Sequence, residues 1–337
     1  MQDKKEIIAI LNQYDLSSNI SNLKVLPSFA NKVWLIELKD KKIVIKNHIT
    51  NPLDRIKKIH QIIRSLSAKN IFIPKIYKNK QEETLTLVGD KIYEISEYID
   101  GEKLGTNDLI EKSAKLLAKI HDSNRSGLEL DIINFEKLNF KINKLIEEFK
   151  INYSSSKLKL NNSLANRIKI IYDFLRFNER MIEKISLRDD YYKFQKSNFV
   201  LTHGDFSYFN IIYHNNDLYI VDWDNVKLRP RAFELQRAIG LICGKGYCNA
   251  NLDEIDEEKA RKFIKAYHNV HPLQKEDLDE LVEVIEYTSL FYWLEFTLEQ
   301  VLKRDYRILE IAPSSIDQAM YWSHNLKKYR DFLYSLI

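Results

Sequence analysis

The pattern of apolar residues changes once along the chain, near residue 100, and this change constrains the fold more than any other feature. Before it, short runs rich in Val, Ile, Leu and Trp are separated by polar breaks, which is typical of β-strands. After it, apolar residues recur at helical spacing over long segments. The sequence therefore predicts an α+β protein with two lobes. Residues 1–99 would form a small antiparallel-sheet lobe, and residues 100–337 a larger, mainly helical lobe.

Two helices are expected among the strands of the first lobe. In "MQDKKEIIAILNQYDL" the side chains of Ile7, Ile8, Leu11 and Tyr14 fall on one helical face. The segment "NPLDRIKKIHQIIRSLSAKN" also repeats apolar residues at helical spacing, with a proline near its start. The strands are expected in "NLKVLPSF", "KVWLIELKD", "KKIVIKNHI", "TLTLV" and "KIYEISEYI". In the second lobe, "FVLTH", "NIIYH" and "LYIVDWD" interrupt the helices and predict a small embedded sheet.

Composition excludes several classes of protein. The chain is 45% hydrophobic and 30% charged, which is typical of a globular protein. No apolar run is long enough to span a membrane, and the first residues lack the apolar stretch of a signal peptide. Two cysteines, Cys243 and Cys248, predict no disulfide framework and favour the cytoplasm. A net charge of +4 is too small to indicate nucleic acid as a partner.

The segment "VLTHGDFSYFNIIYHNNDLYIVDWD", residues 200–224, gathers carboxylates, a histidine and asparagines between strand-like runs. A buried carboxylate is costly unless it is paired or holds a metal. One interpretation is a solvated polar hairpin, with Asp205 in a turn and Asp222 at a strand end. The other is a functional site. The turn composition of "NNDL" would place Asn210 and Asp222 on neighbouring parts of one hairpin.

The spacing within this segment favours a site. His203, Asp205 and Asn210 match the kinase catalytic loop H-x-D-x-x-x-x-N, and Asp222 follows at the end of a strand, where kinases place a metal-binding Asp. Asp205 would orient an incoming hydroxyl and accept its proton. Asn210 and Asp222 would supply oxygen ligands to Mg²⁺. Asp224 would bind a second ion or position the loop, and His203 would hold the loop by hydrogen bonding.

These residues resemble the aminoglycoside phosphotransferase and choline kinase-like superfamily of small-molecule kinases. "HGDFSYFN" and "IVDWDNV" resemble its two signature motifs. "PRAFELQRAIG" resembles the segment that follows, with Glu234 where the family generally has Asp, and "AKLLAKIHDSN" resembles a family helix. The resemblance implies the two-lobed protein-kinase-like fold. It also implies that residues 1–99 bind the nucleotide and residues 100–337 hold the catalytic and acceptor-binding groups.

The resemblance further implies a nucleotide site in the first lobe. Lys46, at the end of an alternating apolar run, is expected to contact ATP. "ISEYIDGEKL" resembles the hinge between lobes, so backbone groups of Glu97, Tyr98 and Ile99 would bind the adenine edge.

Two departures from the family pattern affect the same region. The loop "LPSFANKVW" contains no glycine, so Ser28 or Asn31 would donate hydrogen bonds to the phosphates instead of close-lying backbone. The helix after Lys46 should carry a glutamate to pair with it, yet residues 55–66 contain no acid.

The function expected is that of a cytoplasmic, ATP- or GTP- and Mg²⁺-dependent phosphotransferase. Its acceptor would be a hydroxyl of an aminoglycoside-, amino alcohol-, sugar- or homoserine-like small molecule. The alternative is a kinase-fold binding or structural protein without turnover, similar to relatives of spore-coat proteins, which the two departures favour. A protein kinase is disfavoured because no A-P-E segment follows "DWD".

Overall fold

The computed structural model describes most of the chain as two compact units. One contains Met1–Leu130 and His203–Val226, and the other contains Asp131–Thr202 and Lys227–Ile337. The predicted functional division at residues 99 and 100 stays a prediction. The described residues are 2–28, 31–103, 109–123, 135–153, 162–186, 199–244, 251–310 and 312–336.

The first unit is built on a five-stranded antiparallel sheet, as predicted. The strand order is β1-β2-β3-β5-β4, so β3 lies in the middle of the sheet, paired with both β2 and β5. The connection from β3 to β4 carries helix α2 (Leu53–Ser67). The strands are β1 (Ile20–Leu26), β2 (Lys32–Leu38), β3 (Lys42–His48), β4 (Thr86–Val88) and β5 (Lys91–Glu97).

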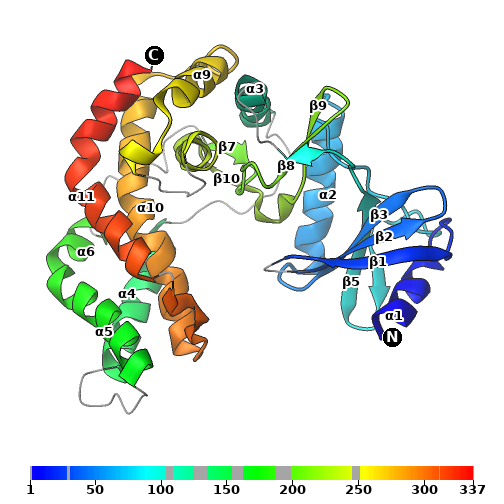
Figure 1. Cartoon of the computed structure of the whole chain (residues 1–337), viewed down its shortest axis with the longest axis horizontal. Helices are drawn as coiled ribbons and strands as arrows, with labels where there is room; N and C mark the ends of the chain where they lie inside the picture. Colours follow the sequence, from blue (N-terminus) through cyan, green and yellow to red (C-terminus); the bar gives the residue numbers. More distant parts are fainter. Residues whose placement is uncertain are drawn as a thin grey trace. The chain divides into compact units, whose positions relative to one another are not determined.

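Helix α1 (Gln2–Leu11) packs against one face of this sheet and forms the core of the unit (Figure 1). Ile7, Ile10, Leu11 and Tyr14 are all buried in it. The sequence prediction placed Ile8 on this face, and that assignment is wrong, because Ile8 is only half-buried. Positions 7, 10, 11 and 14 follow the i, i+3, i+4, i+7 spacing of a single helical stripe. The sheet contributes Trp34, Ile36, Leu38, Ile43, Ile45, Tyr93 and Ile95.

Helix α2 covers the opposite face of the sheet. Side chains alternate along β3, so Ile43 and Ile45 point to the α1 core while Lys46 points to the other face. On that face, His60 of α2 contacts Glu94 of β5. One face of β3 therefore packs in the apolar core with α1. On its other face, Lys46 lies beside polar groups.

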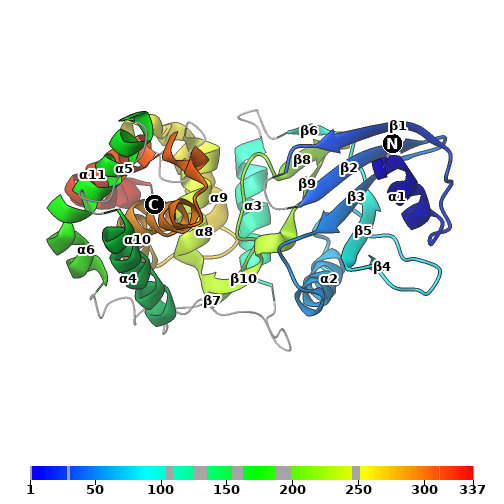
Figure 2. The ribbon, with the colours of Figure 1, turned by 90° about the horizontal axis from the view of Figure 1, so that it is seen from below.

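A second, three-stranded sheet has the order β6-β8-β9 and belongs to the same unit. Strands β8 (Ile211–His214) and β9 (Asp217–Ile220) form the predicted hairpin, and β6 (Glu102–Lys103) pairs with β8. Asn215 and Asn216 at its turn both have positive φ, which asparagine tolerates better than most residues. Helix α3 (Ile110–His121) lies beside this hairpin (Figure 2), where Lys112 Nζ donates to Asn216 O.

The second unit is mainly helical. Its longest helix, α10 (Lys275–Leu302), packs against α11 (Ala312–Ser335), α8 (Arg231–Ala238) and α4 (Phe135–Asn152). Strand β7 (Phe199–Thr202) pairs with β10 (Lys227–Pro230). The remaining elements are α5 (Asn162–Phe177), α6 (Glu179–Ser186), α9 (Glu257–His268), a π-helical turn (Ile239–Cys243) and short 3₁₀ turns at Leu252–Glu254 and Tyr306–Glu310.

The interrupting strands therefore form two small sheets rather than the single one predicted. "FVLTH" pairs with β10, a strand that the sequence did not predict, whereas "NIIYH" and "LYIVDWD" pair with each other.

Cys243 is buried and unpaired, and Cys248 lies outside the described residues. The long helical segments expected after residue 100 include α4, α5 and α6, and residues 187–198 lie outside the description. Within the described residues, no helix is long and apolar enough to cross a membrane.

A group of acids at the start of α10 makes the stability of the second unit depend on pH. Burial raises the pKa of Glu280 to about 7, with further contributions from Asp277 and Glu283, against an opposing effect of Arg231. The folded chain thus binds a proton at Glu280 more tightly than the unfolded chain. This group therefore lowers the free energy of unfolding as the pH rises from 4.5, its ordinary pKa, to about 7.

We expect Glu280→Gln to stabilise the protein at pH 8 by about 1–2 kcal/mol, a value reduced for the partial exposure of the side chain. The gain should vanish below pH 4.5, where the carboxyl is protonated in both states. Urea unfolding at the two pH values measures it. Glu276→Gln, in the first turn of the same helix, serves as the control. Equal stabilisation at both pH values would contradict the assignment.

Candidate active site

The loop between β7 and β8 is held from inside by His203. This histidine is buried, and its Nε2 lies 3.0 Å from the backbone oxygen of Val221. The backbone N–H of Asp205 donates to His203 Nδ1 at 3.2 Å, so the ring proton sits on Nε2 and is donated to Val221. One imidazole thus connects the backbone before Asp222 to the backbone of Asp205.

Gly204 allows this loop to pass close to the segment after β9. Its φ is +84°, and a Cβ there would lie 2.2 Å from the backbone oxygen of Asn225. A side chain would therefore meet both an unfavourable backbone conformation and a backbone atom that cannot move aside. The glycine in "HGD" is required by this close approach.

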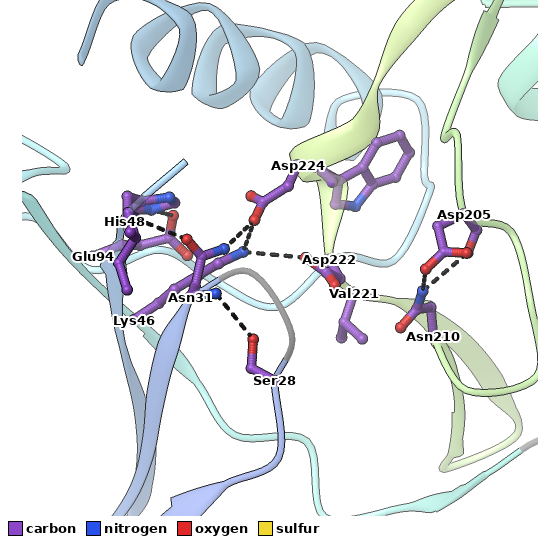
Figure 3. A network of polar contacts seen from close by, with 12 residues as sticks. Ser28, Asn31, Lys46, His48, Glu94, Asp205, Asn210, Val221, Asp222 and Asp224 are labelled. Carbon is purple, nitrogen blue, oxygen red and sulfur yellow. Dashed lines mark hydrogen bonds and ion pairs between the residues drawn. The ribbon is translucent and has the colours of Figure 1, made fainter. Parts of the chain in front are cut away.

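Asp205 and Asn210 face each other across the loop (Figure 3). Asn210 Nδ2 donates to both the backbone oxygen and Oδ2 of Asp205, each at 2.9 Å. The amide oxygen of Asn210 lies on the other branch of the side chain and takes no part in these bonds. The N–H of Val221 donates to the backbone oxygen of Asn210 at 2.9 Å, which places Asn210 beside the strand that ends at Asp222.

Asp222 and Asp224 follow β9 and converge on Lys46 of β3. Lys46 Nζ lies 3.1 Å from Asp222 Oδ1 and 2.7 Å from Asp224 Oδ2 (Figure 3). The Asp222 side chain is 50% exposed and the Asp224 side chain 13%. Two carboxylates and a lysine, separated by about half the chain, are thus brought within direct contact.

Asp222 adopts a left-handed backbone conformation, with φ 66° and ψ 64°. Such a conformation costs most residues about 1–2 kcal/mol, although Asp and Asn tolerate it better than others. It turns the chain from β9 into a short 3₁₀ turn, η2 (Trp223–Asn225). Within this turn the carboxylates of Asp222 and Asp224 both reach the same amine.

The charge of Lys46 is strongly favoured in this setting. Burial alone would lower its pKa, but the negative charges of Asp224, Asp222 and Glu94 raise the pKa above its ordinary value. Lys46 therefore stays protonated at neutral pH and presents a fixed positive charge.

Asp224 is held from two sides. Asn31 Nδ2 donates to Asp224 Oδ2 at 2.5 Å, and Asn31 Oδ1 accepts from the N–H of Ile49. The backbone N–H of Asn31 also donates to Ser28 Oγ at 3.3 Å. From α2, Arg55 donates to the backbone oxygen of Asp224 at 3.2 Å. Asn31 and Ser28 thus position a carboxylate in this structure, and their contact with phosphate stays a prediction.

The predicted hinge follows β5. The N–H of Glu97 donates to Lys75 O at 2.8 Å and that of Tyr98 to Lys42 O at 3.3 Å. These two donors are engaged by the protein itself. In an extended strand the carbonyl of Glu97 and the N–H of Ile99 point to the same side, so they are the hinge groups best suited to an adenine edge.

Three residues of this site were not identified from the sequence: Arg55, His60 and Glu94. Arg55 fixes the Asp224 backbone, while His60 and Glu94 form a polar contact in front of β3. The alternation of "KIYEISEYI" could have placed Glu94 on the Lys46 face. No local sequence pattern could have identified the partner of Arg55, the backbone oxygen of Asp224, because it lies 169 residues away along the chain.

The oxygen ligands present fit a magnesium–nucleotide site better than an all-protein metal site. The described part of the chain contains no group of three or more His, Cys, Asp or Glu side chains that could hold a metal ion. Mg²⁺ is commonly bound by one or two carboxylates, with phosphate oxygens and water completing the octahedron. Asp222, Asp224 and the amide oxygen of Asn210 would supply oxygen donors of this kind, and their role as ligands stays a prediction.

Comparison with known families decides the class of protein. A sequence profile described as "Phosphotransferase enzyme family" matches residues 22–273, well over half of the chain. The chain belongs to this phosphotransferase family. Membership confirms the family resemblance and the predicted enzyme class. No curated protein sequence matches the phosphotransferase significantly.

Solved structures share the fold of this phosphotransferase at low sequence identity. A spectinomycin phosphotransferase, solved with ADP and spectinomycin, is 16% identical over 98% of both chains, with a TM-score of 0.63. An amicoumacin kinase, solved with AMP-PNP and Ca²⁺, is 12% identical over 98% of this chain and 94% of its own, with a TM-score of 0.62. A choline kinase from Cryptosporidium parvum is 18% identical over 98% of this chain and 100% of its own, with a TM-score of 0.61. These likenesses confirm the kinase-like fold.

Proposed function

We propose that this phosphotransferase transfers the terminal phosphoryl group of ATP to a hydroxyl of a small molecule in the cytoplasm. One observation carries the proposal: Lys46, Asp222 and Asp224 meet in a single cluster. The same unit holds the paired Asp205 and Asn210 beside the strand that leads to Asp222. Phosphoryl transfer needs positioned charge more than covalent chemistry, and this cluster supplies it.

Each residue has a role that follows from its setting. Asp205 accepts the proton of the acceptor hydroxyl, because its carboxylate is fixed by Asn210 and by the loop that His203 holds. Lys46 offers a fixed positive charge to the phosphates. Asp222 and Asp224, with the Asn210 oxygen, hold Mg²⁺, which neutralises phosphate charge when bound. The carbonyl of Glu97 and the N–H of Ile99 bind the adenine edge.

The nucleotide and acceptor classes are supported by the related structures. The spectinomycin phosphotransferase was solved with ADP, and the amicoumacin kinase with AMP-PNP and Ca²⁺. These support an adenine nucleotide and a divalent cation. Choline is an amino alcohol, so the choline kinase likeness supports an acceptor whose hydroxyl lies near a cationic nitrogen. An amino alcohol or an aminoglycoside fits this description.

A kinase-fold protein that binds nucleotide without turnover is the second candidate. Two observations favour it. The loop at residues 26–34 contains no glycine, and α2 carries no acid beyond Asp54 in its first turn. In the structure Lys46 instead contacts both carboxylates proposed to hold the metal.

A thermal-shift experiment followed by a turnover screen tests the proposal. Binding of ATP to the folded state should raise the melting temperature, and Mg²⁺ should increase that rise. ATP consumption is then measured against a panel of aminoglycosides, amino alcohols, sugars and homoserine-like compounds. Turnover with one acceptor class supports the enzyme. Stabilisation without turnover supports the binding protein. A melting temperature unchanged by millimolar ATP with Mg²⁺ contradicts both.

A further inference from the structure

The acid of α2, Asp54, lies in its first turn, and residues 55–66 contain none. A carboxylate is present instead on a neighbouring strand. Strands β3 and β5 pair antiparallel, and Lys46 lies directly opposite Glu94 in this register. Directly opposed residues of an antiparallel pair project from the same face, with Cβ atoms about 4.5–5.5 Å apart. Glu94 is therefore the cross-strand neighbour of Lys46, on the face that α2 covers.

Two histidines fix the carboxylate of Glu94. His60 Nε2 of α2 lies 2.8 Å from Glu94 Oε2. His48 Nε2 of β3 lies 3.3 Å from the same oxygen (Figure 3). The second oxygen, Oε1, takes part in neither contact. The Glu94 side chain is 15% exposed and the two imidazoles are almost fully buried. The carboxylate is thus held at one oxygen, with the other left to face a further partner.

Glu94 carries a negative charge in this setting. Burial would raise its pKa, but the hydrogen bonds from His48 and His60 hold the pKa well below its ordinary value. His60 Nδ1 lies 2.7 Å from Thr84 Oγ1, so the hydroxyl of Thr84 can donate to Nδ1 while Nε2–H serves Glu94.

Lys46 needs a negatively charged neighbour such as Glu94, because its present partners, Asp222 and Asp224, are also proposed to bind the metal ion. Its side chain is only 16% exposed, and a cation so enclosed requires a nearby anion. In the proposed function, Asp222 and Asp224 face a divalent cation, which competes with Lys46 for their charge. Glu94 has no such competitor, since its contacts are to histidines.

We propose that Glu94 is the positioning residue of Lys46, supplying from β5 the counter-charge that residues 55–66 of α2 do not carry, and that His60 couples this carboxylate to α2. The inference rests on the proposed nucleotide site. Glu94 touches neither nucleotide nor acceptor, and it acts by holding the lysine amine in place when the two aspartates are engaged. The negative charge expected on the helix is then supplied by β5 instead.

Glu94→Gln tests this role, because it removes the charge and keeps the shape. Affinity for ATP with Mg²⁺, measured by isothermal titration calorimetry, should fall about tenfold, within the range found for coupled neighbouring groups. Glu83→Gln removes an exposed acid of the same unit and should leave the affinity unchanged. Unchanged affinity in Glu94→Gln, with binding intact in the parent protein, overturns the inference and leaves the proposed function standing.

A double-mutant cycle with Lys46→Met separates positioning from general support of the fold. If Glu94 acts through Lys46, adding Glu94→Gln to Lys46→Met should cause almost no further loss of affinity. Additive losses would overturn the inference, because they would mean that Glu94 acts independently of the lysine.

Melting temperatures check that each variant is folded. If Glu94→Gln does not fold, the cycle is run with Glu94→Asp. This substitution keeps the charge but shortens the side chain by one methylene, so part of the affinity for ATP with Mg²⁺ should be lost. Absence of ATP binding in the parent protein overturns both this inference and the proposed function.

Discussion

Asp205→Asn is expected to lower kcat by about 100- to 10,000-fold, the range that a positioned general base contributes. The substitution removes the charge that accepts the hydroxyl proton. It keeps an oxygen that can accept the hydrogen bond from Asn210 Nδ2, so the loop should retain its conformation. Affinity for ATP with Mg²⁺ should stay close to that of the parent, because Asp205 is assigned to the acceptor hydroxyl, whereas Lys46, Asp222 and Asp224 are assigned to the nucleotide and its metal ion.

The measurement is phosphoryl transfer to the acceptor found in the turnover screen, or to water if none is found. Calorimetric titration of ATP with Mg²⁺ and the melting temperature are recorded alongside. Asp217→Asn, in the turn-proximal part of the same hairpin, is the matched control and should be near neutral. Retention of more than a tenth of the parental kcat would refute the base assignment, whereas loss of nucleotide affinity would assign Asp205 to binding.

Local patterns in the sequence predicted the parts of this site that are close together in the chain. The spacing of His203, Asp205 and Asn210 implied one loop, and the structure closes that loop with hydrogen bonds among these residues. The turn signal between Asn210 and Asp222 implied one hairpin, which the pairing of β8 with β9 confirms. Such features depend on backbone preferences over a few residues and can be read directly.

Contacts between distant segments could not be predicted in the same way. Asn31 and Asp224 are 193 positions apart, and Asn31 was assigned to phosphate binding on family resemblance alone. Pairing of β7 with β10 was missed because β10 is short and rich in charge, without the alternation that marks a strand. The Ile8 error is a matter of helical phase, because Ile8 lies about 100° around the helix from Ile7, whereas Ile10 falls within the buried stripe.

The lack of an acid at residues 55–66 of α2 shows what sequence position alone cannot decide. A search at the family's usual position finds none between residues 55 and 66. The register of β3 with β5 nevertheless places Glu94 opposite Lys46. A charge required at one point in space can come from any element that passes it, so its absence from one helix is weak grounds for inferring loss of function.

Asp222→Asn should abolish the contribution of Mg²⁺ to nucleotide binding. The side chain is half exposed at the end of β9, which leaves its second oxygen accessible, and it is one of only two carboxylates in the cluster. Removal of a group that only hydrogen-bonds to a metal ligand already costs about 10- to 100-fold in metal affinity, so loss of a ligand carboxylate should cost at least as much. Asparagine tolerates the left-handed backbone at this position, so the turn into η2 should persist.

The decisive measurement is the difference between ATP affinity with Mg²⁺ and ATP affinity with EDTA. In the parent protein Mg²⁺ should tighten binding, and in Asp222→Asn this tightening should largely disappear. Affinity without metal should change little or improve, because one anion near the phosphates has been removed and Lys46 loses one competing partner. Asp90→Asn, an exposed turn residue of the same unit, controls for net charge. Undiminished tightening by Mg²⁺ in Asp222→Asn would mean that the cation is held elsewhere, and the roles given to Asp224 and Asn210 would fall with it.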